Sequence, residues 1–87
     1  MHGWKVEEVA AALVGFINTE LMAPGHSLAA GDAFEPAGID SMALLKVLLF
    51  IEQQYGFWIP DEDLVEPHIR SAVDLARYVC AHAPAAG

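Results

Sequence analysis

The apolar residues of this chain fall into three groups that repeat every three or four positions, the spacing of one face of an α-helix. They predict three longer helices, over residues 4–21, 41–55 and 71–82. Gly56 directly follows the second group, where glycine often ends a helix. Ser71 and Asp74 open the third with the spacing of a capping box. No alternation typical of strands is found, so the sequence predicts an all-α protein.

The connections between these helices differ in length. Residues 23–40 contain Pro and Gly at several positions and keep no period, which predicts a long loop between helices 1 and 2. Leu28 and Phe34 are expected to anchor this loop in the core; the alternative is that they are simply loop hydrophobes. Residues 60–64 begin with proline and three acids and predict a short helix of one or two turns. The predicted fold is a small antiparallel four-helix bundle.

Length and charge narrow the class of protein. The 87 residues fit a single domain over 1–87, with a core at about 4–82 and a flexible tail at 83–87. Twelve acidic and four basic residues give a net charge of −8, which disfavours nucleic acid and anionic membranes as partners. No bilayer-spanning run or secretory signal is visible. The single cysteine, Cys80, cannot form an internal disulfide, so we expect a monomer in a reducing cytoplasm.

The second predicted helix is apolar around most of its circumference. Its core face is expected to contain Leu44, Val47, Leu48, Ile51 and Tyr55. The opposite side is marked by Lys46 and Gln53, which are flanked by Met42, Ala43, Leu49 and Phe50. A small bundle cannot bury all of this surface. Either the outer face binds a partner, or the long loop covers part of it.

The polar residues do not form a catalytic or metal-binding pattern. His2, His26, His68 and His82 are scattered and show no pair at helical spacing. One cysteine without clustered histidines does not suit zinc, and the acids at 61–63 lack the spacing of a calcium loop. The sequence therefore predicts no enzyme activity and no metal site.

Ser41 is the one residue placed for chemical modification. It lies in Gly38-Ile39-Asp40-Ser41-Met42, between the long loop and the second predicted helix. The start of a helix has unpaired N–H groups and a positive dipole end, so a phosphate ester would be favoured there. The alternative is that Ser41 only caps or opens the helix, which is a common role for serine. The residue taken alone favours that alternative.

The ordered set of motifs resembles the acyl carrier proteins, the phosphopantetheine-carrying domains of fatty acid, polyketide and peptide synthesis. The resemblance covers roughly residues 6–80. It rests on the attachment motif 38–42, on Phe34 seven positions ahead of the serine, on Glu52 with Tyr55-Gly56, on Ile59-Pro60-Asp61-Glu62-Asp63, and on Ser71, Val73, Leu75, Ala76 and Tyr78. Each motif is weak alone, whereas the set at these spacings is specific.

The resemblance implies a carrier that does no chemistry itself. Ser41 would accept 4′-phosphopantetheine from coenzyme A through a separate phosphopantetheinyl transferase that uses Mg²⁺, and Asp40 would help to position that metal and the coenzyme. The arm would hold an acyl group as a thioester, loaded by a ligase or transferase and presented to downstream biosynthetic enzymes. An aminoacyl cargo from a dedicated ligase is the alternative. Peptide-type carriers usually show Gly-Gly-His-Ser at this place, which favours acyl loading.

The chain also departs from the family. Fatty-acid carriers have acids along the second helix, whereas here its outer face contains Met42, Ala43, Lys46, Leu49 and Phe50. We therefore expect a dedicated partner in specialised biosynthesis that docks on Met42, Lys46, Leu49 and Phe50. The competing hypothesis from another class is an unmodified helical interaction module that uses the same face.

Overall fold

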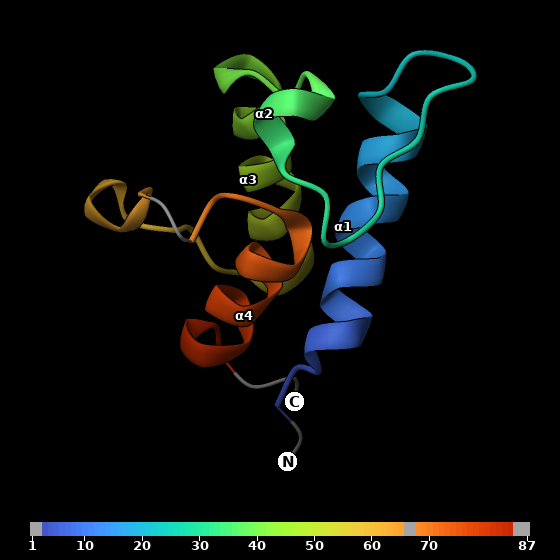
Figure 1. Cartoon of the computed structure of the whole chain (residues 1–87). Coiled ribbons are helices and arrows are strands. Elements are labelled where there is room, and N and C mark those ends of the chain that lie inside the picture. Colours follow the sequence, from blue (N-terminus) through green and yellow to red (C-terminus); the bar gives the residue numbers. More distant parts are fainter. Residues whose placement is uncertain (1–2, 66–67, 85–87) are drawn as a thin grey trace.

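The computed structural model describes residues 3–65 and 68–84, and within them every regular element is helical. The elements are α1 (Val6–Glu20), α2 (Phe34–Ala37), α3 (Ser41–Tyr55), the 3₁₀-helix η1 (Asp61–Asp63) and α4 (Ala72–His82) (Figure 1). This confirms the all-α class with three longer helices. The predicted bounds of the second helix are those observed, and the short helix after Pro60 is a single 3₁₀ turn.

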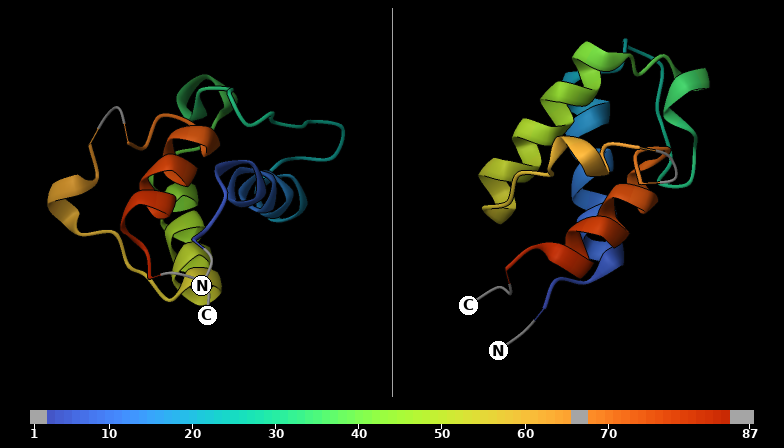
Figure 2. Two further views of the ribbon diagram at one scale, coloured as in Figure 1. Left: turned by 90° about the horizontal axis from the view of Figure 1, so that it is seen from below. Right: turned by 90° about the vertical axis from the view of Figure 1, so that its left-hand side faces the viewer.

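The three longer helices pack around one core. α1 contacts α4 most extensively and also packs against α3. α1 runs in the opposite direction to both α3 and α4 (Figure 1), so the connection 56–71 has to cross back along the bundle, as Figure 2 shows from two further sides. The start of α1 and the end of α4 lie at the end of the bundle opposite to α2. The start of α3 is therefore far from both.

The core is formed by the predicted helix faces and by the loop anchors. Val9, Leu13 and Ile17 of α1 are buried, as are Val47, Leu48 and Ile51 of α3 and Leu75, Ala76 and Val79 of α4. Leu28 and Phe34 are also buried, so the long loop is anchored as predicted. Leu44 and Tyr55, expected on the core face of α3, are only half-buried.

One prediction about the long loop is incomplete. Residues 34–37 form the short helix α2 within the segment predicted as an unbroken loop. Phe34 begins this helix, and its backbone N–H donates to the carbonyl of Arg70 at 2.8 Å. Burial of the Phe34 ring and this long-range bond stabilise a turn that its own four residues would not hold. Local sequence signals, which are dominated here by Pro36 and Gly38, therefore pointed to a loop.

Caps define the ends of the longer helices. At the start of α4 the Ser71 hydroxyl accepts a hydrogen bond from the Asp74 N–H at 3.2 Å and donates to the Asp74 carboxylate at 2.9 Å. α3 ends at Gly56, whose φ of 65° is left-handed. In the predicted tail the carbonyl of Pro84 accepts a hydrogen bond from the Trp4 indole at 2.6 Å, and residues 85–87 lie outside the described residues.

The remaining expectations concern membrane-spanning helices, metal sites and the histidines. None of the helices within the described residues combines the length and the apolar character that crossing a bilayer requires. No group of three His, Cys, Asp or Glu side chains in residues 3–65 and 68–84 is arranged to hold a metal ion. His68 and His82 pack against Tyr78 and His26 is exposed, whereas His2 lies outside the described residues.

Candidate functional site

The segment between α2 and α3 turns Ser41 out of the protein. α2 ends at Gly38 with φ 89°, a left-handed conformation that costs a residue with a side chain about 1–2 kcal/mol. The Ile39 N–H then donates to the carbonyl of Phe34 at 3.0 Å, and the Ile39 side chain is buried. This turn and anchor place the next two residues, Asp40 and Ser41, at the surface, where both are exposed.

Asp40, and not Ser41, caps α3. The Asp40 backbone is extended, and its Oδ1 accepts a hydrogen bond from the Ala43 N–H at 2.9 Å. Ser41 is the first residue of the helix. The alternative that Ser41 provides the cap is therefore wrong, although Ser41 does open the helix. Because the Asp40 carboxylate accepts the Ala43 N–H, the serine hydroxyl is not used as the cap, and other N–H groups of the first turn stay unpaired.

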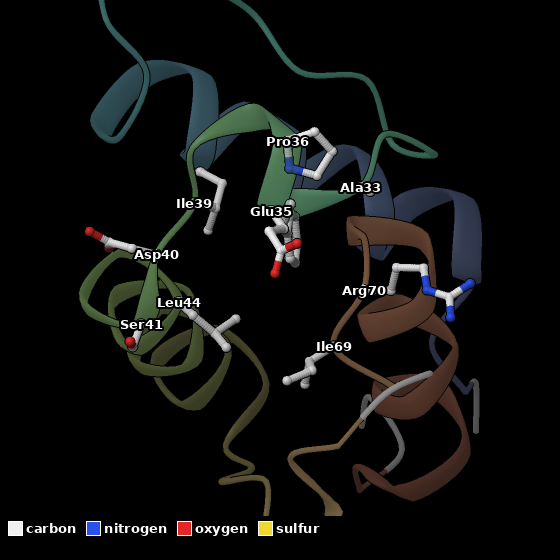
Figure 3. A pocket seen from close by; sticks show the side chains of 10 residues that line it. Ala33, Glu35, Pro36, Ile39, Asp40, Ser41, Leu44, Ile69 and Arg70 are labelled. Atoms are coloured by element: carbon white, nitrogen blue, oxygen red, sulfur yellow. The ribbon is translucent and has the colours of Figure 1, made fainter.

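A groove of about 460 Å³ lies beside Ser41 (Figure 3). It is bordered by α2, the first turn of α3 and the residues that precede α4. Leu44 and Ile69 point toward each other across it, whereas Asp40 and the guanidinium of Arg70 point away. No histidine or cysteine is among its lining residues, so the groove offers the serine no side-chain base of those types. Ser41 is exposed at the edge of this groove, and the lining also includes the carboxylates of Glu35 and Asp40.

Comparison with known proteins decides the family. The family described as "Phosphopantetheine attachment site" matches residues 11–79. The chain belongs to this family of carrier proteins. An acyl carrier protein of Kineococcus radiotolerans is 27% identical over 74 residues, which are 84% of this chain and 89% of that protein. The family's prosthetic group is 4′-phosphopantetheine, bound covalently.

A solved structure shows the same fold at low sequence identity. It is the crystal structure of the Bradyrhizobium japonicum glycine:[carrier protein] ligase complexed with glycylated carrier protein. The similarity has a TM-score of 0.64 at 18% identity and covers 83% of this chain and 95% of the other. The fold of this carrier is therefore that of a protein solved with a loading enzyme.

The geometry around Ser41 is compatible with a phosphopantetheine ester. The hydroxyl is exposed and is not used as the cap. The unpaired N–H groups and the dipole of the first turn of α3 favour the negative charge of a phosphodiester. The adjoining groove has apolar walls at Leu44 and Ile69. The residues present therefore suit the group that the family carries.

The outer face of α3 differs in part from the sequence prediction. Met42 and Leu49 are exposed, at 68% and 45%, so the long loop leaves them uncovered. Phe50, which the sequence placed on this face, is half-buried because its ring stacks on Phe16 of α1 with centroids 4.5 Å apart. Leu45 was missed and is 43% exposed. Its spacing, three residues after Met42 and four before Leu49, could have revealed it.

Titratable side chains gather elsewhere in this carrier, around Tyr78 of α4. Its hydroxyl donates a hydrogen bond to the carboxylate of Asp63, and its ring stacks on His82 with centroids 4.1 Å apart. Burial, this hydrogen bond and the negative charges of Asp63 and Glu62 raise the pKa of Tyr78 to about 12. None of these residues lines the groove beside Ser41. They tie η1 to α4 and take no part in the candidate site.

Proposed function

We propose that Ser41 is the attachment point of the 4′-phosphopantetheine arm, and that the protein carries an acyl group on this arm as a thioester between enzymes of a specialised biosynthetic pathway. The observation that carries this proposal is an exposed serine hydroxyl at the first residue of α3, with the cap supplied by Asp40. The protein itself performs no catalytic step. It presents the cargo, and its partners carry out the chemistry.

The modification needs a phosphopantetheinyl transferase and coenzyme A. The Ser41 Oγ forms a bond to the phosphorus next to the pantetheine, the pyrophosphate bond of coenzyme A breaks, and adenosine bisphosphate leaves. The hydroxyl proton passes to a base of the transferase. Asp40, exposed and adjacent to the nucleophile, is proposed to help place the transferase's Mg²⁺ and coenzyme.

Intact-mass spectrometry tests this assignment. The purified protein is incubated with coenzyme A, Mg²⁺ and a promiscuous phosphopantetheinyl transferase. We expect one added phosphopantetheine, which is absent in Ser41→Ala and retained in the matched control Ser27→Ala, because Ser27 is exposed in the loop. A folded wild-type chain that gains no mass would overturn the carrier assignment and favour the unmodified interaction module.

An aminoacyl cargo is the second candidate. It is favoured by the similarity in fold to a carrier solved in glycylated form with its ligase. The two cargoes can be separated by offering the arm-bearing protein to that ligase with glycine and ATP. Formation of a glycyl thioester that hydroxylamine removes would support aminoacyl loading. If the chain stays unloaded while the ligase's own carrier is glycylated, acyl loading remains the preferred proposal.

The outer face of α3 is proposed to dock the loading partner through Met42, Lys46, Leu49 and Phe50, with Leu45 added from the structure. Exposed apolar side chains on neighbouring turns provide area that a partner can bury. Leu49→Glu should slow cargo loading and leave the helical circular dichroism intact, whereas Phe50→Glu should also lower stability, because Phe50 stacks on Phe16. Unchanged loading in Leu49→Glu would argue against this face.

A further inference from the structure

The side chain of Asn18 holds the long loop at its midpoint. Its Nδ2 donates to the carbonyl of Leu28 at 3.0 Å, and its Oδ1 accepts from the Leu28 N–H at 2.8 Å. A primary amide places a donor and an acceptor side by side, so it can pair with both polar groups of one peptide residue. The two bonds also fix which way the amide faces. Asn18 lies outside the buried stripe of α1, which is formed by Val9, Ala10, Leu13 and Ile17.

Backbone bonds extend this attachment from Leu28 toward Ser41. Two residues further along, the Ala30 carbonyl accepts from the Val73 N–H at 3.0 Å, in the first turn of α4. The Phe34 N–H then donates to the carbonyl of Arg70 at 2.8 Å. The side chains of Leu28 and Phe34 are both buried. The loop is thus connected to α1 at Leu28 and to α4 at Ala30, and α2, which follows it, is connected to Arg70 through its first residue, Phe34.

We propose that Asn18 is a positioning residue for the modification of Ser41: by pairing with Leu28 it orders the loop that leads to Ala33 and Phe34, two residues that line the groove beside Ser41. This inference rests on the proposed function of Ser41. Asn18 touches neither the serine nor its groove. The cap on Asp40 keeps the start of α3 in place without it, so the effect is expected in binding of the transferase rather than in the chemical step.

The kinetic test compares three variants. Asn18→Ala removes both bonds to Leu28, and we expect a KM for this carrier about tenfold higher with little change in kcat, since each net hydrogen bond is worth a factor of several. Asn18→Asp keeps an acceptor for the Leu28 N–H but turns a second oxygen toward the Leu28 carbonyl, so its KM should also rise. Thr19→Ala is the matched control on the same helix, because Thr19 is exposed. Its KM should equal that of the wild type.

Amide hydrogen exchange adds a readout that does not depend on the transferase. In Asn18→Ala the Leu28 amide should lose protection, and so should the Val73 amide that donates to Ala30, while amides in the middle of α1 stay protected. Faster exchange at Leu28 together with an unchanged KM would overturn the positioning role. A fall in kcat alone would also overturn it.

The two levels of the proposal can fail separately. If wild-type Ser41 takes no arm, the proposed function fails and this inference falls with it. If the wild type is modified and Asn18→Ala has the same KM, only the inference fails. Should Asn18→Ala be too unstable to measure, Asn18→Asp, which keeps one of the two bonds, serves in its place, and an unchanged KM there counts equally against the positioning role.

Discussion

Asp40 performs one observed role and one proposed role, and a pair of substitutions can separate them. The observed role is structural: Oδ1 caps α3 through the Ala43 N–H at 2.9 Å. The proposed role is to help position the metal and coenzyme of the transferase beside Ser41. Asparagine caps a helix about as well as aspartate, whereas alanine does not. Asp40→Asn therefore removes the charge and retains the cap, and Asp40→Ala removes both.

The structural cost follows mainly from the cap, because Asp40 is exposed and its side chain accepts the Ala43 N–H. Replacing an aspartate N-cap with alanine costs about 1 kcal/mol. In a domain of this size that lowers Tm by roughly 4–8 °C. Asp40→Asn loses only the interaction of the charge with the helix dipole, a few tenths of a kcal/mol at moderate salt. Urea unfolding followed by circular dichroism measures the free energy of unfolding of both variants.

The functional cost, unlike the structural cost, should be similar in the two variants. If the carboxylate acts on the transferase's metal or coenzyme, Asp40→Asn should lose at least about tenfold in kcat/KM for phosphopantetheine transfer, the scale of one charge-assisted bond. Asp40→Ala should lose a similar factor. Asp32→Asn is the charge-matched control, because Asp32 is an exposed loop aspartate that bonds one N–H, that of Ala29. Transfer to Asp40→Asn at the wild-type rate would refute the proposed role and leave Asp40 as a cap.

Three further predictions concern stability. Phe34→Ala should lower the free energy of unfolding by about 3–5 kcal/mol in urea, since it empties a buried site that anchors α2. Gly38→Ala should cost about 1–2 kcal/mol because φ is 89° there, whereas Gly15→Ala in α1 should stabilise by about 0.5–1 kcal/mol. The pKa of Tyr78, raised from 10.0 to about 12, means that the folded state holds the phenol proton more tightly. The stabilisation that results is fully present below pH 10 and is lost as the pH rises toward 12. Between these pH values the free energy of unfolding should therefore fall less in Tyr78→Phe than in the wild type.

The parts of the fold that were predictable depend on local signals. α3 has the bounds expected from its apolar period and from Gly56, whose left-handed φ ends the helix. Ser71 and Asp74 likewise marked the start of α4. Leu28 and Phe34 were predictable anchors because a long loop needs buried side chains to be ordered. The helix ends are decided by residues within a few positions of one another, whereas the two anchors follow from the length of the loop.

The features that were missed depend on contacts between distant segments. α2 needs the carbonyl of Arg70, and the orientation of Phe50 depends on Phe16 in another helix. Asn18 shows the same limit, since its partner Leu28 lies ten residues away in a loop without a period. A helical wheel shows which side of a helix is polar. It does not show which polar residue on that side contacts another part of the chain.

Whether the Ser41 hydroxyl can be modified depends on which of two adjacent residues, Asp40 or Ser41, caps α3. Asp40 and Ser41 are both good N-cap residues, so the sequence is compatible with a helix that is capped by either. The left-handed turn at Gly38 and the burial of Ile39 set the register, and the cap falls on Asp40. With the register shifted by one, the serine oxygen would itself accept an N–H of the first turn and be less exposed. An anchored apolar residue two positions before the serine therefore determines whether its hydroxyl can be presented to an enzyme.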